Sequence, residues 1–177
     1  MKKENKPSSA ASEGTKFNRT TAKRKGEVAE AAFLSKAIDL GFDVAKPWGD
    51  SSQFDFIVHS GPRCWRVQVK SARHQRQRGY GVKVSGNRDS YTEGDIDFLV
   101  TYIVPENIWY VIPIGAVQGL SRLWFFPDSR RGSRFEMYRE AWCLMACPGD
   151  GKCNPEISVH RSCLAGSVAG VRPLRGK

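Results

Sequence analysis

The sequence predicts one α/β domain with a central mixed β-sheet flanked by α-helices. Three observations favour this class: a helix-like segment near the N-terminus, several strand-like runs after it, and a stripe of aromatic residues at helical spacing near the C-terminus. A helix, then strands in succession, then a helix suits a layered α/β sandwich. The 177 residues, 40% of them hydrophobic, suffice for one core.

The N-terminal segment, residues 1–25, is predicted to be a disordered basic arm. It contains eight Lys or Arg residues, two Glu residues and almost no large apolar residue. A segment of low hydrophobicity and high net charge cannot bury enough apolar surface to fold by itself. Such an arm either contacts nucleic acid or serves as a solubilising tail, and composition alone leaves both alternatives open.

The sequence shows no feature of a membrane or secreted protein. No apolar run approaches the roughly 20 residues of a membrane-spanning helix. The N-terminal lysines are followed by no apolar segment, so no signal peptide is visible. We therefore expect a cytoplasmic protein that does not enter a membrane.

Residues 26–40 are predicted to form an amphipathic helix that ends at Gly41. Its expected apolar side consists of Ala31, Leu34 and Ile38. Glu30 falls on that same side. An acid at the edge of a core is unfavourable unless it meets a cation, a metal ion or hydrogen-bond donors, so Glu30 is a candidate functional residue.

Residues 54–72 predict a β-hairpin around a Ser-Gly-Pro turn. With residues 59–62 as the loop, Asp55 would lie opposite Arg66 and diagonal to Gln68. Gln68 and Lys70 are two residues apart and share a face with Asp55. The alternative to a functional patch is an ordinary polar outer face with a cross-strand ion pair. The reverse, apolar face is expected to hold Phe54, Phe56, Val58, Trp65, Val67 and Val69.

The remaining elements follow from shorter patterns. Residues 42–52 predict an edge strand and a loop, 73–81 a polar connection, and 82–85 a strand. Residues 95–104 and 108–114 predict a buried antiparallel pair. Residues 134–146 predict a second amphipathic helix, because its aromatic and Met side chains recur at helical spacing. These are Phe135, Tyr138, Trp142 and Met145.

A basic run with no acidic residue extends from residue 63 to residue 88. A solvated surface normally mixes charges of both signs, so this run indicates a polyanionic ligand, for which nucleic acid is the main candidate. No Walker loop, dinucleotide-binding fingerprint or nucleophile-elbow motif is present. The basic residues of the run are Arg63, Arg66, Lys70, Arg73, Arg76, Arg78, Lys83 and Arg88.

Residues 148–177 predict an irregular C-terminal extension that contains cysteines. Cys143, Cys147, Cys153 and Cys163 lie within 21 residues, but their spacing lacks the two close pairs typical of a zinc site. We expect buried or incidental thiols rather than zinc ligands. The odd total of five cysteines and the expected cytoplasm argue against a disulfide framework.

Three segments together resemble the PD-(D/E)XK nuclease superfamily. They are GEVAEAAFLSKAIDLGFDV, GDSSQFDFIV and WRVQVKSA, in that order. More narrowly, the chain is similar to the bacterial PD-(D/E)XK endonuclease family that includes a group I intron homing endonuclease, in which Gln replaces the second acid. The opening helix and strand also resemble archaeal Holliday junction resolvases. The resemblance covers roughly residues 26–145 and implies a restriction-endonuclease-like core, with a nuclease domain at residues 26–147.

The resemblance also implies which residues act. Glu30 stands for the acid of the family's helix, Asp55 for its metal-binding Asp, Gln68 for the variant acid position and Lys70 for the lysine. Phe54 stands where the family usually has Pro. The implied activity is hydrolysis of DNA phosphodiester bonds by an endonuclease that depends on Mg²⁺ or Mn²⁺.

The chemistry of that reaction explains these residue types. A phosphodiester needs an activated water and positive charge near its oxygens, and a divalent ion held by oxygen ligands supplies both. The expected ligands are Asp55, the Gln68 amide oxygen and the Val69 carbonyl, while Lys70 positions the water or stabilises phosphoryl charge. Replacing a carboxylate by an amide removes an attraction on the order of 4 kcal/mol at about 4 Å and a dielectric of about 20. Glu30 would restore that charge if it lies near Asp55.

DNA is the expected partner of this protein. We expect a homo-oligomer, dimer or tetramer, because each active site cuts one strand. The alternative function is a non-catalytic nucleic-acid-binding domain on the same scaffold with a decayed metal site. Besides the N-terminal arm, the expected DNA-binding residues are Lys46, Arg73, Arg76, Arg78, Lys83 and Arg88.

Overall fold

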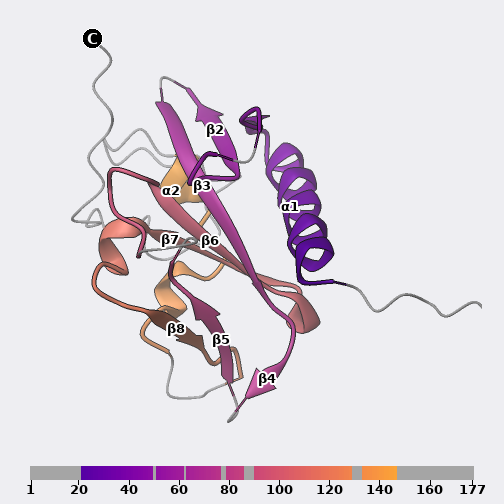
Figure 1. Ribbon diagram of the computed structural model, residues 1–177, viewed down its shortest axis with the longest axis vertical. Helices are drawn as coiled ribbons and strands as arrows, with labels where there is room; N and C mark the ends of the chain where they lie inside the picture. Colours follow the sequence, from indigo (N-terminus) through magenta and orange to yellow (C-terminus); the bar gives the residue numbers. More distant parts are fainter. Residues whose placement is uncertain are drawn as a thin grey trace, which may run out of the picture.

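The computed structural model describes residues 21–49, 51–61, 63–76, 79–85, 90–128 and 133–146. These residues form a five-stranded mixed sheet with a long helix on one face and a three-stranded sheet on the other (Figure 1). The helices are α1 (Ala22–Asp39) and α2 (Cys143–Ala146), with short 3₁₀ helices η1 (Val104–Glu106), η2 (Ile114–Ala116) and η3 (Glu136–Tyr138). The strands are β1 (Asp43–Ala45), β2 (Phe56–Ser60), β3 (Arg63–Ala72), β4 (Gln75–Arg76), β5 (Gly79–Lys83), β6 (Phe98–Ile103), β7 (Ile108–Pro113) and β8 (Arg122–Phe125).

The central sheet has the strand order β1-β2-β3-β6-β7. Strands β3 and β6 are parallel, and the other neighbours are antiparallel, so the predicted mixed sheet is confirmed. β1 lies at the edge, as expected. β6 and β7 form the predicted antiparallel pair, and the connection between them is η1. Their side chains are almost all buried because both faces of the sheet are covered.

Helix α1 begins at Ala22, four residues earlier than predicted. Thr21 caps its N-terminus, because the side chain of Thr21 accepts a hydrogen bond of 3.2 Å from the backbone N–H of Arg24. Of the predicted basic arm, residues 1–20 lie outside the described residues. α1 is not apolar enough to cross a bilayer, and neither is any other helix in the described ranges.

The buried side of α1 differs from the predicted one. The side chains in the core are Ala29, Phe33 and Ala37, whereas the predicted residues Ala31, Leu34 and Ile38 are exposed. Phe33 selects this side, because its ring packs against Phe56, Trp109 and Trp142, with ring centroids 5.0–6.2 Å apart. The small alanines one turn away on each side let the helix approach the sheet closely.

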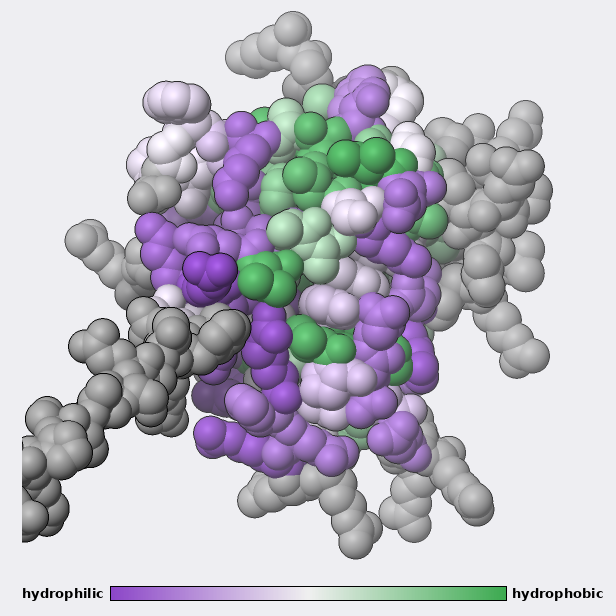
Figure 2. Space-filling model, turned by 90° about the vertical axis from the view of Figure 1, so that its right-hand side faces the viewer, coloured by the Kyte–Doolittle hydropathy of each residue, from purple (hydrophilic) through white to green (hydrophobic). Residues whose placement is uncertain are grey.

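The exposed side of α1 therefore keeps some apolar surface. Val28, Leu34 and Ile38 are 48%, 37% and 57% exposed, respectively. Figure 2 shows the face of the molecule on which α1 lies, with a group of hydrophobic residues bordered by hydrophilic ones.

The β2–β3 hairpin is confirmed, but its register differs from the prediction by two residues. Ile57, not Asp55, lies opposite Arg66, and only residues 61–62 separate the paired Ser60 and Arg63. A shift of two residues leaves every side chain of a strand on the same face. Asp55 and Gln68 therefore still share a face. Phe54 is an exception to the predicted apolar face, because it packs in the other core, beneath the small sheet.

The small sheet has the order β4-β5-β8 and occupies the face where the prediction placed a helix. β4 and the start of β5 lie in the predicted polar connection, and β8 was not predicted. Tyr80 and Val82 of β5 and Leu123 and Phe125 of β8 point inward and are buried against the central sheet. This second core cannot be read from such short strands, because four or five residues give a weak alternation signal.

The predicted C-terminal helix is wrong: η3 and α2 are separated by a break at Glu140. Glu140 has a positive φ of 49°. Its backbone N–H donates to the Trp109 carbonyl at 2.8 Å, and its carboxylate accepts from the backbone N–H of Trp109 and the indole N–H of Trp142. Phe135 packs beneath the small sheet, whereas Trp142 packs beneath α1. A straight helix cannot bury one stripe in two cores.

Cys143 is buried and disulfide-bonded, so the expectation of a thiol is wrong at this position. Cys147, Cys153 and Cys163, together with the predicted extension at residues 148–177, lie outside the described residues. Within the described ranges, no cluster of three or more His, Cys, Asp or Glu side chains is placed to hold a metal ion.

Candidate active site

Asp55 lies directly before β2, and one oxygen of its carboxylate takes part in two hydrogen bonds. The Oδ2 atom accepts from the backbone N–H of Val69 at 2.8 Å and from the side-chain amide of Gln68. The backbone N–H of Asp55 donates to the Val67 carbonyl at 2.9 Å, which fixes Asp55 against β3. Among the described residues, no hydrogen bond is made to the second oxygen, Oδ1.

Gln68 brings the Asp55 carboxylate and the Val69 carbonyl to one point. The side chain belongs to the middle of β3, and the residue is only 7% exposed. Its Nε2 atom donates to Asp55 and lies 3.4 Å from the Val69 carbonyl oxygen. A buried amide needs such partners. The three predicted metal ligands, Asp55, Gln68 and Val69, are thus in direct contact.

Glu30 of α1 forms an ion pair with Lys46, which follows β1. The Lys46 ammonium lies 2.7 Å from the Glu30 carboxylate and 5.7 Å from the centre of the Phe56 ring. The hydrogen bond to Glu30 raises the pKa of Lys46 above its ordinary value. The side of α1 on which Glu30 was predicted to lie is exposed, but the Glu30 side chain itself is only 23% exposed, and its partner is a cation.

The charges of Glu30 and Lys70 both act on Asp55. Burial raises the pKa of the Asp55 carboxyl above its ordinary value, the hydrogen bond from Val69 opposes this, and the negative charge of Glu30 raises the pKa further. The Gln68 hydrogen bond and the Lys70 charge lower it. Of the other three predicted site residues, Gln68 therefore contacts the Asp55 carboxylate directly, and Glu30 and Lys70 act on it through their charges.

Lys70 contacts an aromatic residue that the sequence did not point to. Its ammonium lies 5.3 Å from the centre of the Tyr91 ring, within the range of a cation–π interaction. Tyr91 is buried beneath the small sheet and comes from the loop before β6. Because Tyr91 lies 21 positions further along the chain, only the tertiary structure reveals this contact.

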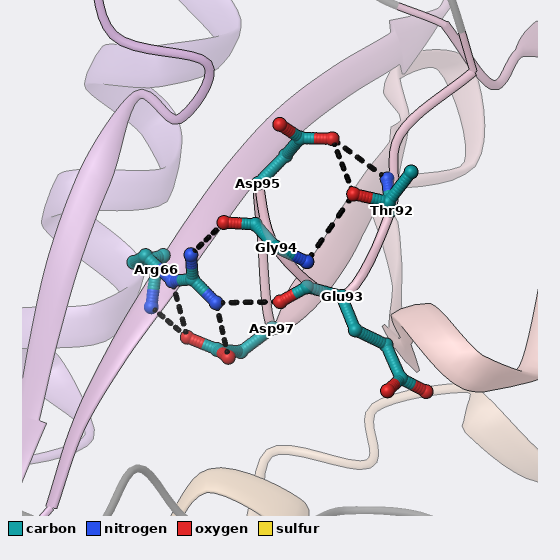
Figure 3. A network of polar contacts seen from close by, with 6 residues as sticks. All are labelled: Arg66, Thr92, Glu93, Gly94, Asp95 and Asp97. Atoms are coloured by element: carbon teal, nitrogen blue, oxygen red, sulfur yellow. Dashed lines mark hydrogen bonds and ion pairs between the residues drawn. The ribbon is translucent and has the colours of Figure 1, made fainter.

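Arg66 of β3 holds the loop that carries Tyr91 (Figure 3). Its backbone N–H, Nε and Nη2 donate to the Asp97 carboxylate at 2.7–3.1 Å. Nη2 also donates to the Glu93 carbonyl at 2.8 Å, and Nη1 donates to the Gly94 carbonyl. The predicted pairing of Arg66 with Asp55 is wrong, because Asp97 already accepts from Arg66.

The same loop is closed by hydrogen bonds of its own. The Asp95 carboxylate accepts from the backbone N–H and the hydroxyl of Thr92, at 2.9 and 2.7 Å. These hydrogen bonds lower the pKa of Asp95 below its ordinary value. Because Thr92 is next to Tyr91, the turn fixes the chain immediately after the ring that contacts Lys70.

The predicted DNA-binding residues have different surroundings. Lys46 is paired with Glu30, and Arg73 donates from Nη2 to the Lys25 carbonyl at 3.4 Å. Arg76 and Lys83 are exposed on β4 and β5. Arg78 and Arg88 lie outside the described residues.

The side chains present suit a hard divalent cation. Carboxylate, amide and carbonyl oxygens are the ligands of Mg²⁺ and Mn²⁺, and Mg²⁺ commonly takes only one or two carboxylates and keeps several waters. Asp55 and Glu30 supply two carboxylates, and the Val69 carbonyl and Gln68 amide adjoin the first of them. Soft ligands are absent from this set, which makes zinc a poor match.

The fold and the order of these residues along the chain are those of the PD-(D/E)XK class. The family model described as "PD-(D/E)XK endonuclease" matches residues 20–125, which include Glu30, Asp55, Gln68 and Lys70. The chain belongs to this family, and the resemblance seen in its sequence is confirmed.

The chain is also similar to a solved structure, that of the bacterial homing endonuclease I-Ssp6803I. The two are 28% identical, with a TM-score of 0.63, and the match covers 71% of this chain and 93% of the other. This likeness confirms the predicted restriction-endonuclease-like α/β fold. No curated protein sequence matches the chain.

Proposed function

We propose that this protein is a DNA endonuclease that depends on Mg²⁺ or Mn²⁺ and hydrolyses phosphodiester bonds, either at specific sites in the manner of a homing endonuclease or at DNA junctions. One observation carries the proposal: the oxygen atoms of Asp55 and Val69 converge on the Gln68 amide, and the charges of Glu30 and Lys70 act on Asp55. The similarity to a homing endonuclease supports it.

Asp55 is the main metal ligand in this proposal. Its Oδ2 atom is held by Val69 and Gln68, which leaves Oδ1 to bind the ion. The Val69 carbonyl and, after rotation of the amide, the Gln68 oxygen would complete the protein ligands. When bound, the divalent ion would lower the pKa of a water and offset charge on the phosphate oxygens.

Glu30 and Lys70 provide the remaining charges. Glu30 contributes the negative charge that Gln68 lacks, and Lys46 holds the Glu30 carboxylate in place. Lys70 supplies a positive charge for the phosphate or positions the attacking water. The Tyr91 ring limits where the Lys70 ammonium can lie.

The alternative, a non-catalytic DNA-binding domain, has one observation in its favour. The Gln68 amide presents Nε2, not its oxygen, to Asp55 and to the Val69 carbonyl. In this orientation the amide nitrogen occupies the position between the two oxygen ligands. An enzyme would have to rotate the amide on binding the ion, whereas a binding domain would keep it as it is.

Cleavage of DNA distinguishes the two. The purified protein with Mg²⁺ or Mn²⁺ should nick plasmid DNA, and the Asp55→Ala and Lys70→Ala variants should not. Asp43→Ala is a matched control, since Asp43 is an exposed acid on β1 that pairs with His59. Activity that survives both site substitutions would refute the site. Linear duplex, a four-way junction and single-stranded DNA, tested side by side, would identify the substrate.

DNA and further copies of this chain are the expected partners of the site. The DNA backbone would contact the N-terminal arm and the basic residues of the run, and two active sites in a homo-oligomer, dimer or tetramer, would cut the two strands. The expected location is the cytoplasm. Sedimentation with and without duplex DNA would test the oligomer.

A further inference from the structure

The outer face of the small sheet carries an unusual pair of charges. Lys83 of β5 lies directly opposite Arg122 of β8 in the antiparallel register, and both are exposed. Like charges directly opposite each other destabilise a strand pair. Within the described ranges, neither side chain has an ion-pair or hydrogen-bond partner. The repulsion between Lys83 and Arg122 therefore lowers the stability of the β5–β8 pair.

Gly79, Gly81 and Lys83 alternate on the outer side of β5. Gly79 is buried beneath the Phe126 ring, with which an added Cβ would clash, whereas a Cβ added to Gly81 would lie 3.2 Å from the Trp124 ring and 3.3 Å from Nη1 of Arg122. The indole and the guanidinium therefore lie over the backbone of β5. No residue of β4, β5 or β8 is acidic.

The location of this face relates it to the candidate active site. β4 and β5 follow β3 directly along the chain, and β5 contacts β3, the strand that carries Gln68 and Lys70 (Figure 1). On the inner side, β5 and β8 pack against the face of the central sheet to which Ala72 of β3 belongs. The small sheet is therefore next to the strand that carries two residues of the candidate site.

We propose that the outer face of β4, β5 and β8 binds the phosphate backbone of duplex DNA beside the bond that is cut, with Lys83 and Arg122 on phosphates and Trp124 in contact with the sugars. This inference rests on the proposed function and deepens it. Phosphate neutralises the repulsion between the two cations, which explains why they are opposed. β-strands that bind DNA through an exposed face are a known mode of recognition.

The test is the binding of duplex DNA without cleavage. A fluorescently labelled duplex of mixed sequence is titrated with protein in EDTA at several salt concentrations, and the midpoint of thermal unfolding is measured in parallel. For the Lys83→Gln/Arg122→Gln variant we expect weaker binding and a slope of log affinity against log salt that is smaller by about 2, one unit for each lost phosphate contact. The unfolding midpoint should be unchanged or higher, because the repulsion is gone.

Two controls separate charge from structure. The Lys83→Arg/Arg122→Lys variant keeps both charges and should keep the slope. Lys36→Gln removes one cation from α1, beyond the opposite face of the central sheet, and should also keep the slope. An unchanged slope for the Lys83→Gln/Arg122→Gln variant, or a slope that falls only together with the unfolding midpoint, would overturn the proposal.

The outcome does not depend on catalysis. If the slope falls as expected but the wild-type protein cuts no DNA with Mg²⁺ or Mn²⁺, the surface stands and the proposed endonuclease fails. If the slope is unchanged while Asp55→Ala abolishes cleavage, the endonuclease stands and this surface is wrong.

Discussion

The β2–β3 pair and the β5–β8 pair both place charged or polar side chains side by side, but they differ in what those side chains meet. At β2–β3, the Asp55 carboxylate accepts hydrogen bonds from Gln68 and Val69, and the charges of Glu30 and Lys70 shift its pKa in opposite directions. At β5–β8, Lys83 and Arg122 oppose each other with no acid on either strand. Hydrogen bonds fix the position of the Asp55 carboxylate, whereas the positive charges of Lys83 and Arg122 stay available to a ligand.

This difference separates two uses of the same strand geometry. A carboxylate held by hydrogen bonds costs little reorganisation when chemistry occurs. Unpaired surface cations gain free energy when they replace the counterions of a polyanion. Substitutions at the two places should therefore change different properties of the protein.

Asp55→Asn should have the largest effect. Without the carboxylate charge, we expect the cleavage rate to fall on the order of 10³-fold or more. The fold should become more stable near neutral pH, because Asn can still accept both hydrogen bonds on one oxygen and no longer carries a charge that burial disfavours. Plasmid cleavage and chemical denaturation measure the two effects. A variant that is inactive and also less stable would show that Asp55 is structural.

Lys70→Met should remove activity without affecting the fold. We expect a rate loss of about 10²–10³-fold, from lost stabilisation of the phosphate charge, and a change in the free energy of unfolding within about 0.5 kcal/mol. Single-turnover cleavage at saturating DNA isolates this step. Lys70→Arg keeps the charge and should retain part of the rate. Equal rates for the Met variant and the wild type would exclude Lys70 from the chemistry.

Arg66→Met tests the ion pair between Arg66 and Asp97, which holds the loop beside the candidate active site. Its side chain and that of Asp97 are 20% and 11% exposed, so the variant leaves a largely buried carboxylate without its cation. We expect the free energy of unfolding to fall by about 2 kcal/mol. Faster hydrogen exchange should appear first in the loop at residues 90–97. Unchanged exchange there would mean that Arg66 does not hold the loop.

Arg122→Glu should make the β5–β8 pair resemble the β2–β3 pair. With Lys83 opposite an acid, we expect the strand pair to gain about 0.5–1 kcal/mol of stability while the affinity for duplex DNA falls. Urea denaturation and fluorescence anisotropy measure the two changes. The reverse result, a less stable protein with unchanged affinity, would remove the contrast between the two pairs.

In the metal-free protein, Glu30→Gln should produce the smallest of these changes, a lower pKa of Asp55, because the Glu30 charge raises that pKa. Between its ordinary and raised pKa, the folded protein binds more protons at Asp55 than the unfolded chain does. Stability from this residue is therefore lost as the pH rises through that window. In the variant, the pH range between the ordinary and the folded-state pKa of Asp55 should be narrower. Carboxyl NMR titration in EDTA measures the pKa, and an unchanged value would separate Glu30 from the site.

The hairpin of the candidate site could be predicted because the alternation of its apolar and polar residues assigns the same faces even when the register is wrong by two residues. The loop was assigned two residues too long, yet Asp55 and Gln68 kept a common face, since a strand repeats every two residues. The order of the helix, the Asp and the Gln-x-Lys motif gave the family. The sequence thus predicted the common face of Asp55 and Gln68, because the alternation of each strand and the order of the motifs agreed.

Long-range contacts explain the rest. Apolar residues occur on two sides of α1, and only the ring packing of Phe33 selects one of them. The C-terminal helix is broken because Glu140 pairs with Trp109, a residue 31 positions away. Tyr91 and Asp97 reach Lys70 and Arg66 only after β6 has paired with β3. No local pattern encodes these partners.

The parallel pairing of β3 with β6 has a consequence for how the protein can diverge. The two strands are joined by residues 73–97, and that single crossover contains β4, β5 and the loop held by Arg66. The register of β3 on β6 is set by the strands themselves. Under the proposed function, a change of length or sequence between Arg76 and Ser90 should alter the surface proposed to contact DNA while Gln68 and Lys70 keep their positions on β3, and chimaeras that exchange this segment would test this separation.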